Sequence, residues 1–194
     1  MEKTPLLLNK KAKRRALAAG GAVLLAGAGF VYCWSNAELK EYPSSTVLLD
    51  RQGAPLRIRL GENDVDCRPV SLEMTGSWAA KALIAAEDKR FYSHPGVDPL
   101  AILRALVLNV VHGRVVSGAS TISTQVVKMN RLQPRTLWTK IKEAAGALGM
   151  ERRMSKEQIL EHYLNRAPFG SNLTGLESAS QRYFGKHAAD LSLA

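Results

Sequence analysis

The sequence predicts a mainly α-helical domain that follows an apolar, membrane-spanning segment and a short β hairpin. Three observations support this fold class: an uncharged run near the start of the chain, two strand-like runs around a turn signal, and helix-capping residues that recur from residue 71 onward. The 194 residues can form one domain with an appendage, and 46% hydrophobic with 23% charged residues is typical of a folded protein. This composition excludes an intrinsically disordered chain.

The first 34 residues have the pattern of a membrane anchor. Residues 1–15 contain six Lys and Arg and one Glu, and so carry +5 of the net charge of +10. The uncharged run from Ala16 to Trp34 would span roughly 28 Å as a helix, enough to cross a bilayer. Because basic flanks stay inside, we predict a cytoplasmic tail (1–15), a transmembrane anchor (16–34) and a domain on the outer, periplasmic face of the cytoplasmic membrane. A cleavable signal peptide ending near Ala37 is the alternative.

Charge and cysteine placement exclude other classes of protein. Half of the net charge precedes the apolar run, so the high pI does not indicate a nucleic-acid-binding surface. Cys33 belongs to the anchor and Cys67 to the domain, so they form no disulfide framework. Neither lies among residues with metal-ligand spacing, and we expect no protein metal site and no catalytic thiol.

Turn and capping signals place the remaining elements. Residues 35–70 are predicted as a linker with a β hairpin, in which Thr46–Leu49 and Leu56–Leu60 flank the turn Asp50–Gly53. Residues 71–194 are predicted to form the helical domain. Its helices are expected to begin near Ser77, at Asp98-Pro99 with a stop at Gly113, at Ser120, at Thr136, at Ser155 with Gln158, and at Thr174 with Glu177 before Gly185. Leu191–Ala194 look like a further helix cut short, so the domain is expected to be truncated.

Glu87 is the first candidate for chemistry. It ends the helix expected from Ser77 and lies three and four residues after Ile84 and Leu83, on their apolar face. We expect a carboxylate there to be partly desolvated, and desolvation suits an acid to general base catalysis near neutral pH. A glutamate that turns to solvent, or pairs with Arg90, is the alternative.

Thr121, Gln125 and Lys128 form the second candidate site. On a helix capped by Ser120 they fall on one face at a spacing of four and three residues, and they offer a hydroxyl, an amide and an ammonium group. Next to a loop containing Gly118 and a helix N-terminus, this row suits an oxygen-rich anion such as a diphosphate. A solvated polar face explains the same pattern.

Lys140 and Glu143 form the third candidate, since a separation of three residues makes them neighbours on a helix. An exposed ion pair is the alternative. The surrounding segment is basic and fits anionic lipid headgroups or a phosphate leaving group; its basic residues are Arg135, Lys140, Lys142, Arg152 and Arg153.

In this order, the segments resemble the glycosyltransferase domain of class A penicillin-binding proteins, glycosyltransferase family 51. The first family motif, Glu-Asp-x-x-Phe-x-x-His-x-Gly, is complete as Glu87, Asp88, Phe91, His94 and Gly96. The second, Gly-x-Ser-Thr-x-x-Gln-Gln with a following lysine, is present as Gly118, Ser120, Thr121, Gln125 and Lys128. The fourth, Ile-Leu-Glu-x-Tyr-Leu-Asn, is present as Ile159, Leu160, Glu161, Tyr163, Leu164 and Asn165.

Two positions depart from the family pattern. Thr124 replaces the first glutamine of the second motif, a position that also varies in the penicillin-binding protein 1C type. The segment Arg166–Gly170 resembles the same type. Thr139 replaces the arginine of the third motif, Arg-Lys-x-x-Glu, so a diphosphate contact is either missing or supplied by Arg135. The resemblance covers roughly residues 37–194, and within the family the sequence is most similar to the penicillin-binding protein 1C type.

The resemblance implies a lysozyme-like fold and a peptidoglycan glycosyltransferase that polymerises lipid II into β-1,4-linked strands and releases polyprenyl diphosphate. By the same resemblance Glu87 is the general base, and Glu143 with Lys140 binds the donor diphosphate, or a Mg or Mn ion on it. Asp88 would orient the site, and His94 either contacts substrate or is a buried structural histidine. Further substrate contacts implied are Phe91, Ser120, Thr121, Gln125, Lys128 and Asn165.

The partners implied are lipid II, the growing glycan strand, the cytoplasmic membrane and other cell wall synthesis proteins. Two further functions stay open from the sequence. The chain could bind lipid II as a catalytically weak scaffold, because Thr124 and Thr139 replace family residues. It could also be a peptidoglycan glycosidase, because a lysozyme-like fold with two carboxylates can use water as the acceptor.

Overall fold

The computed structural model describes residues 39–130, 134 and 136–192, together with Arg15, Gly27, Gly29, Val31, Tyr32 and Trp34. The predicted tail and anchor, Cys33, and Arg135 therefore lie wholly or largely outside the described residues. Among the described residues, no helix combines the length and apolar character needed to cross a membrane.

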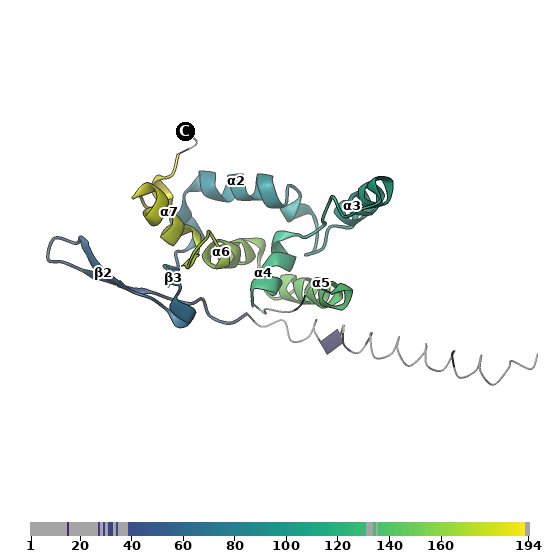
Figure 1. The fold of residues 1–194 in the computed structure, drawn as a ribbon, viewed down its shortest axis with the longest axis horizontal. Coiled ribbons are helices and arrows are strands. Elements are labelled where there is room, and N and C mark those ends of the chain that lie inside the picture. The colour runs from purple at the N-terminus through teal and green to yellow at the C-terminus, as the bar shows by residue number, and fades with distance from the viewer. Residues whose placement is uncertain are drawn as a thin grey trace, which may run out of the picture.

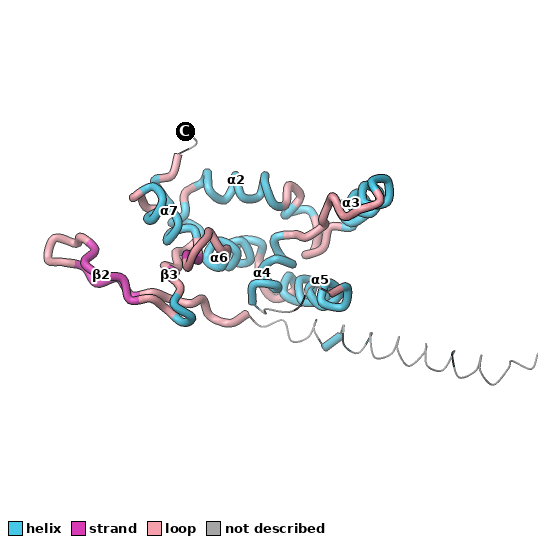
Figure 2. The backbone as a smooth tube through the Cα atoms, viewed as in Figure 1, coloured by secondary structure: helices cyan, strands magenta, loops and turns pink. Residues whose placement is uncertain are grey.

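Helices dominate the described part of the chain, as predicted (Figures 1 and 2). The order is β1 (Thr46–Leu49), β2 (Pro55–Arg59), β3 (Asp66–Cys67), α2 (Ser77–Glu87), α3 (Pro99–His112), α4 (Ile122–Asn130), α5 (Leu137–Glu151), α6 (Lys156–Arg166), β4 (Leu173–Thr174) and α7 (Leu176–Phe184). Short 3-10 helices cover Glu62–Asp64, Leu72–Thr75, Phe91–Ser93 and Ala188–Asp190. This mainly helical architecture fits a lysozyme-like domain.

The predicted hairpin is present and projects from the helical body (Figure 1). β1 and β2 pair antiparallel, and the turn between them is closed by Asp50, whose carboxylate accepts the N–H groups of Gln52 and Ala54. Gly53 supplies the positive φ of +85° that the turn requires. A second, parallel pair joins β3 to β4 and ties the linker to the segment before α7.

The core lies where α4, α5 and α6 meet (Figure 1). Its buried side chains are Phe91, Ile122, Val126, Met150, Ile159, Leu160, Tyr163, Leu164 and Ala167. Gly146 lets α5 approach α4 closely, because a Cβ at this position would be 2.9 Å from a methyl group of Val127. In contrast α2 contains no buried residue, and Ala105 is the only buried residue of α3.

Most capping predictions are confirmed, with two corrections. Asp98, Thr136 and Ser155 cap α3, α5 and α6 with their side chains, and Gly113 and Gly185 end α3 and α7 in the left-handed conformation. Ser120 does not cap α4; Thr121 does, since its hydroxyl accepts the Thr124 N–H at 3.1 Å. α7 begins after Gly175 rather than at Thr174. In both cases side-chain spacing alone did not locate the nearby backbone turn. Leu191 and Ser192 are not helical, and the rest of the predicted further helix, Leu193 and Ala194, lies outside the described residues.

Candidate active site

Glu87 occupies the last position of α2, and its side chain is exposed, contrary to the expected partial burial. The reason is that α2 covers the core loosely, so Leu83 and Ile84 are themselves only half-buried. The carboxylate does not pair with Arg90 either. Instead its Oε2 accepts a hydrogen bond of 2.8 Å from Nε2 of Gln125 on α4, which joins two of the predicted site segments directly.

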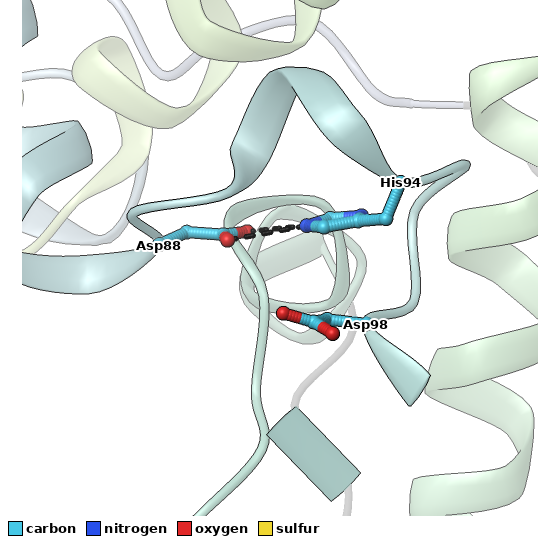
Figure 3. Close-up of side chains that lie close together, drawn as sticks. All are labelled: Asp88, His94 and Asp98. Atoms are coloured by element: carbon cyan, nitrogen blue, oxygen red, sulfur yellow. Dashed lines mark hydrogen bonds and ion pairs between the residues drawn. The ribbon is translucent and has the colours of Figure 1, made fainter. Parts of the chain in front are cut away.

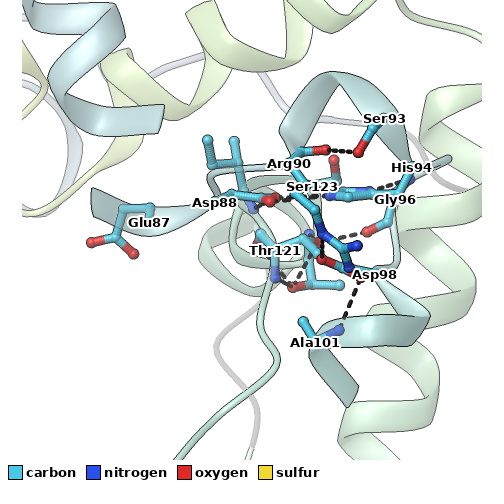
Figure 4. Close-up of polar contacts among 12 residues, drawn as sticks. Glu87, Asp88, Arg90, Ser93, His94, Gly96, Asp98, Ala101, Thr121 and Ser123 are labelled. Atoms are coloured by element: carbon cyan, nitrogen blue, oxygen red, sulfur yellow. Dashed lines mark hydrogen bonds and ion pairs between the residues drawn. The ribbon is translucent and has the colours of Figure 1, made fainter. Parts of the chain in front are cut away.

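Asp88, the next residue, points the opposite way, into the interior (Figure 4). Its carboxylate lies 3.1 Å from Nε2 of His94 and accepts the N–H of Ile122, the first residue of α4. A negative charge at a helix N-terminus is favourable. Asp88 therefore fixes the end of α2, and with it Glu87, against the start of α4.

His94 is also buried and takes the structural alternative (Figure 3). Besides the contact with Asp88, its Nδ1 accepts the N–H of Gly96 at 3.2 Å. Both ring nitrogens are thus used inside the protein, so the expected substrate contact is not available to this ring in the structure.

Asp88, His94 and Asp98 place one ligand atom each within 4.8 Å of one another, a grouping that could hold a metal ion (Figure 3). Asp98, however, caps α3 through Ala101 N–H and pairs with the Arg90 guanidinium. Burial raises the pKa of Asp98, but these hydrogen bonds and the Arg90 charge outweigh it and lower the pKa. Every member is satisfied by protein groups, so the cluster needs no metal to be stable.

Thr121 and Thr124 form a reciprocal cap at the start of α4. Thr121 Oγ1 accepts the Thr124 N–H, and Thr124 Oγ1 accepts the Thr121 N–H at 2.9 Å. In the usual capping box a glutamine or glutamate fills the second role, so Thr124 replaces the expected glutamine without loss of the cap. Thr121 also donates to the Gly96 carbonyl at 2.6 Å and is buried, which corrects its predicted place in a substrate-facing row.

Two other predicted substrate contacts are interior residues. Phe91 is fully buried in the core, where the Lys156 ammonium lies 4.4 Å from its ring centre. Asn165 is 1% exposed, and its amide bonds both the N–H and the C=O of Val70. The side chains of both residues make internal packing or backbone contacts. Motif spacing alone does not distinguish such contacts from substrate binding.

Asn165 acts together with other polar residues of α6 to fasten the linker. Glu161 accepts the Leu72 N–H at 2.9 Å, and the Arg166 guanidinium donates to the Lys40 carbonyl. The linker therefore follows the surface of α6 instead of hanging free. A hollow of about 440 Å³ lies along this contact and is lined by none of the predicted site residues; its lining is Leu39, Lys40, Glu41, Tyr42, Ser44, Pro69 and His162.

Among the predicted site residues that the structure describes, Gln125, Lys128, Ser120 and Lys140 reach the surface at least in part, whereas Glu143 is buried and paired with Lys140. Lys128 and Ser120 are exposed. Lys140 Nζ lies 2.6 Å from Glu143 Oε2, and the Glu143 side chain is 9% exposed against 51% for Lys140. Gly146, one turn after Glu143, faces Val127 of α4, since a Cβ added there would be 2.9 Å from a Val127 methyl group. Glu143 therefore lies on the face of α5 that packs against α4.

Cys67 matches the expectation of an unreactive thiol. It is buried and not in a disulfide. Burial, and then the charge of Asp66, raises the pKa of its thiol to about 11, so the nucleophilic thiolate is scarce near neutral pH.

Residues 56–194 match the family model described as Transglycosylase. This chain therefore belongs to the transglycosylase family, as the sequence motifs indicated.

Named relatives are penicillin-binding proteins. Penicillin-binding protein 1C of Escherichia coli (strain K12) is 38% identical over 189 residues, which cover 97% of this chain and 24% of the relative. Penicillin-binding protein 1A of Aquifex aeolicus (strain VF5) is 46% identical over 125 residues, 64% of this chain and 17% of the relative. Penicillin-binding protein 1A of Escherichia coli (strain K12) is 37% identical over 179 residues, which cover 88% of this chain and 21% of the relative. The chain spans a quarter or less of the length of these relatives.

Proposed function

We propose that this chain is a peptidoglycan glycosyltransferase that joins lipid II units into β-1,4-linked glycan strands at the outer face of the cytoplasmic membrane. Family membership supports the reaction class. The observation that carries the assignment to this site is the contact of 2.8 Å between Glu87, exposed at the end of α2, and Gln125, on the helix that also presents Lys128.

In the proposed reaction Glu87 removes the proton from the 4-hydroxyl of the acceptor sugar. The freed oxygen attacks the anomeric carbon of the donor, the bond to the diphosphate breaks, and the configuration at that carbon inverts. General base catalysis contributes typically 10²- to 10⁴-fold to such a step. The exposure of Glu87 gives the acceptor hydroxyl direct access to the carboxylate, while Gln125 holds it in place.

The departing polyprenyl diphosphate needs positive charge. Lys128 and Lys140 are exposed ammonium groups on adjacent helices and would bind its oxygens. Glu143 fixes Lys140 through their ion pair of 2.6 Å. Thr139, at the position of the family arginine, caps α5 with Thr136 and so provides no replacement charge.

A divalent ion would fit between the Glu143 carboxylate and the donor diphosphate. Mg²⁺ and Mn²⁺ favour oxygen ligands, and Mg²⁺ is often held by one or two carboxylates plus substrate phosphates. The Glu143 carboxylate, with the donor diphosphate, would hold such an ion, which would supply charge neutralisation. The Lys140 ammonium occupies the same carboxylate, so we expect stimulation by the ion rather than an absolute requirement.

The exposed apolar face of α3 supports a location at the membrane surface. Leu103, Leu106, Val110 and Val111 are each more than half exposed, and Val115 in the following loop is 87% exposed. An apolar patch of this kind marks an interaction surface. Since lipid II carries a polyprenyl tail, a helix that dips into the bilayer surface would bring the site to its substrate.

Product analysis tests the assignment. The chain, incubated with fluorescent lipid II in detergent or vesicles, should yield glycan strands that lengthen with time and are shortened by lysozyme. Addition of a chelator should lower the rate without abolishing it. Release of short sugars from preformed strands would indicate a glycosidase, and binding of lipid II without elongation would indicate a scaffold; either outcome would overturn the proposal.

A further inference from the structure

Tyr163 lies behind the candidate general base, in the second layer of the site. It belongs to α6 and packs in the core, where it is 6% exposed. Its hydroxyl lies 3.4 Å from Oε1 of Gln125, and Nε2 of the same amide lies 2.8 Å from Glu87. Three residues from three helices thus form one chain of contacts, from Tyr163 through Gln125 to Glu87.

The chemistry of the three groups fixes the direction of hydrogen-bond donation, which runs from Tyr163 to Gln125 and from Gln125 to Glu87. A carboxylate only accepts hydrogen bonds, so the NH₂ end of the Gln125 amide must face Glu87. The carbonyl end then faces the Tyr163 hydroxyl, which must donate. Burial, and then the negative charge of Glu87, raises the pKa of Tyr163 to about 12. The hydroxyl therefore keeps its proton near neutral pH and remains a donor.

Without the hydroxyl, the carbonyl end of the half-buried Gln125 amide loses its donor. The amide is then free to rotate and to release Glu87. The contact of 3.4 Å is long for a hydrogen bond between oxygens, which fits an orienting contact more than a strong stabilising one.

We propose that Tyr163 is a positioning residue, which orients the Gln125 amide so that this amide holds the Glu87 carboxylate toward the acceptor hydroxyl. The expected effect on the reaction rate rests on the proposed function, whereas the contacts among the three side chains do not. Tyr163 touches no reacting atom; it acts through Gln125.

Tyr163→Phe removes the hydroxyl and keeps the ring packing, so the variant should fold normally. We expect kcat for glycan elongation to fall about three- to tenfold, as for the loss of one ordinary hydrogen bond, with KM for lipid II unchanged. Tyr183→Phe is the matched control, because it deletes a hydroxyl that donates to the Phe169 carbonyl at 2.8 Å, outside this chain of contacts; its kcat should equal that of the parent chain.

A double-mutant cycle separates positioning from mere packing. In a Gln125→Met background, which has no amide to orient, Tyr163→Phe should have no further effect on kcat. Equal kcat for Tyr163→Phe and the parent chain, or an additive loss in the Gln125→Met background, would overturn the inference while leaving the glycosyltransferase assignment intact.

A measurement that does not need activity tests the same geometry. The side-chain NH₂ signal of Gln125 in a nitrogen-15 NMR spectrum is assigned by its absence in Gln125→Met. We expect its two protons to be resolved and slow to exchange in the parent chain, and to move toward free-amide positions in Tyr163→Phe. An unchanged signal refutes the positioning role, whether or not the parent chain polymerises lipid II.

Discussion

At the scale of single residues, neighbouring side chains at the end of α2 have opposite tasks. Glu87 is exposed and held by one amide, whereas Asp88 is buried and bonded to His94 and to the start of α4. The sequence motif presents the two acids together, but only the backbone direction at the helix end separates them. The buried acid stabilises the framework, and the exposed acid is left free for a substrate.

Glu177 is a second buried acid that stabilises the framework, and it makes stability depend on pH. Burial raises its pKa, but the Ala188 N–H and the side chains of Gln181 and His187 outweigh this and lower the pKa below the ordinary 4.5. An acid with a depressed pKa in the folded state stabilises the fold above its unfolded pKa, and this contribution is lost as pH falls through the folded pKa.

We therefore predict that thermal unfolding of the parent chain shifts to lower temperature between about pH 6 and pH 3 by more than that of Glu177→Gln, because protonation removes this contribution. Differential scanning calorimetry at several pH values measures the shift. The same pH dependence in both proteins would show that Glu177 contributes nothing.

At the scale of elements, the site depends on how α4 begins. Thr121 and Thr124 cap this helix, Asp88 binds its first N–H, and the Gly96 carbonyl receives the Thr121 hydroxyl. Gly96 itself has a φ of +99°, and a Cβ there would be 2.9 Å from the Ala147 carbonyl oxygen of α5. The first motif therefore specifies a loop that fits tightly over α5 as well as the candidate general base.

Gly96→Ala should lower the free energy of unfolding by roughly 2–4 kcal/mol, because strain at positive φ and overpacking add together. Gly113→Ala is the control: its φ is +62° with nothing within 4 Å of the added Cβ, and it should lose only roughly 1–2 kcal/mol. Urea denaturation measures both. Equal losses would contradict a close fit between the Gly96 loop and α5.

At the scale of the whole molecule, α3 stands at the end of the body opposite to the β1–β2 hairpin (Figure 1). Its apolar residues are exposed, while the core is formed by α4, α5 and α6. Ala105 is the buried residue of α3, so the exposed leucine and valine side chains of this helix form the surface for the membrane contact proposed above.

A fluorescent label on α3 should report this contact. In a Cys33→Ser background, Cys67 is buried and unreactive, so Leu106→Cys can be labelled selectively with an environment-sensitive dye. On phospholipid vesicles we expect a blue shift at Leu106→Cys and none at the control Arg51→Cys in the hairpin turn. Water-like emission from both positions would exclude insertion of α3.

Local signals in the sequence predicted the helices, the hairpin, most caps and the family, because caps and turns depend on residues close in the chain. The inward orientation of Phe91, Thr121 and Asn165 was missed, since burial depends on which helices pack together. The part played by Tyr163 was also not predicted. Its contact with Gln125 joins residues 38 positions apart, and no spacing rule connects them.

In the proposed mechanism the Glu87 carboxylate removes the acceptor proton. The most direct measurement is the single-turnover rate of elongation by Glu87→Gln, with the Kd for lipid II determined on the same protein. We predict a rate about 10²- to 10⁴-fold below the parent chain, with Kd and the unfolding temperature unchanged, because glutamine keeps the shape but cannot accept the proton. A rate within a factor of about three of the parent chain would exclude Glu87 as the general base.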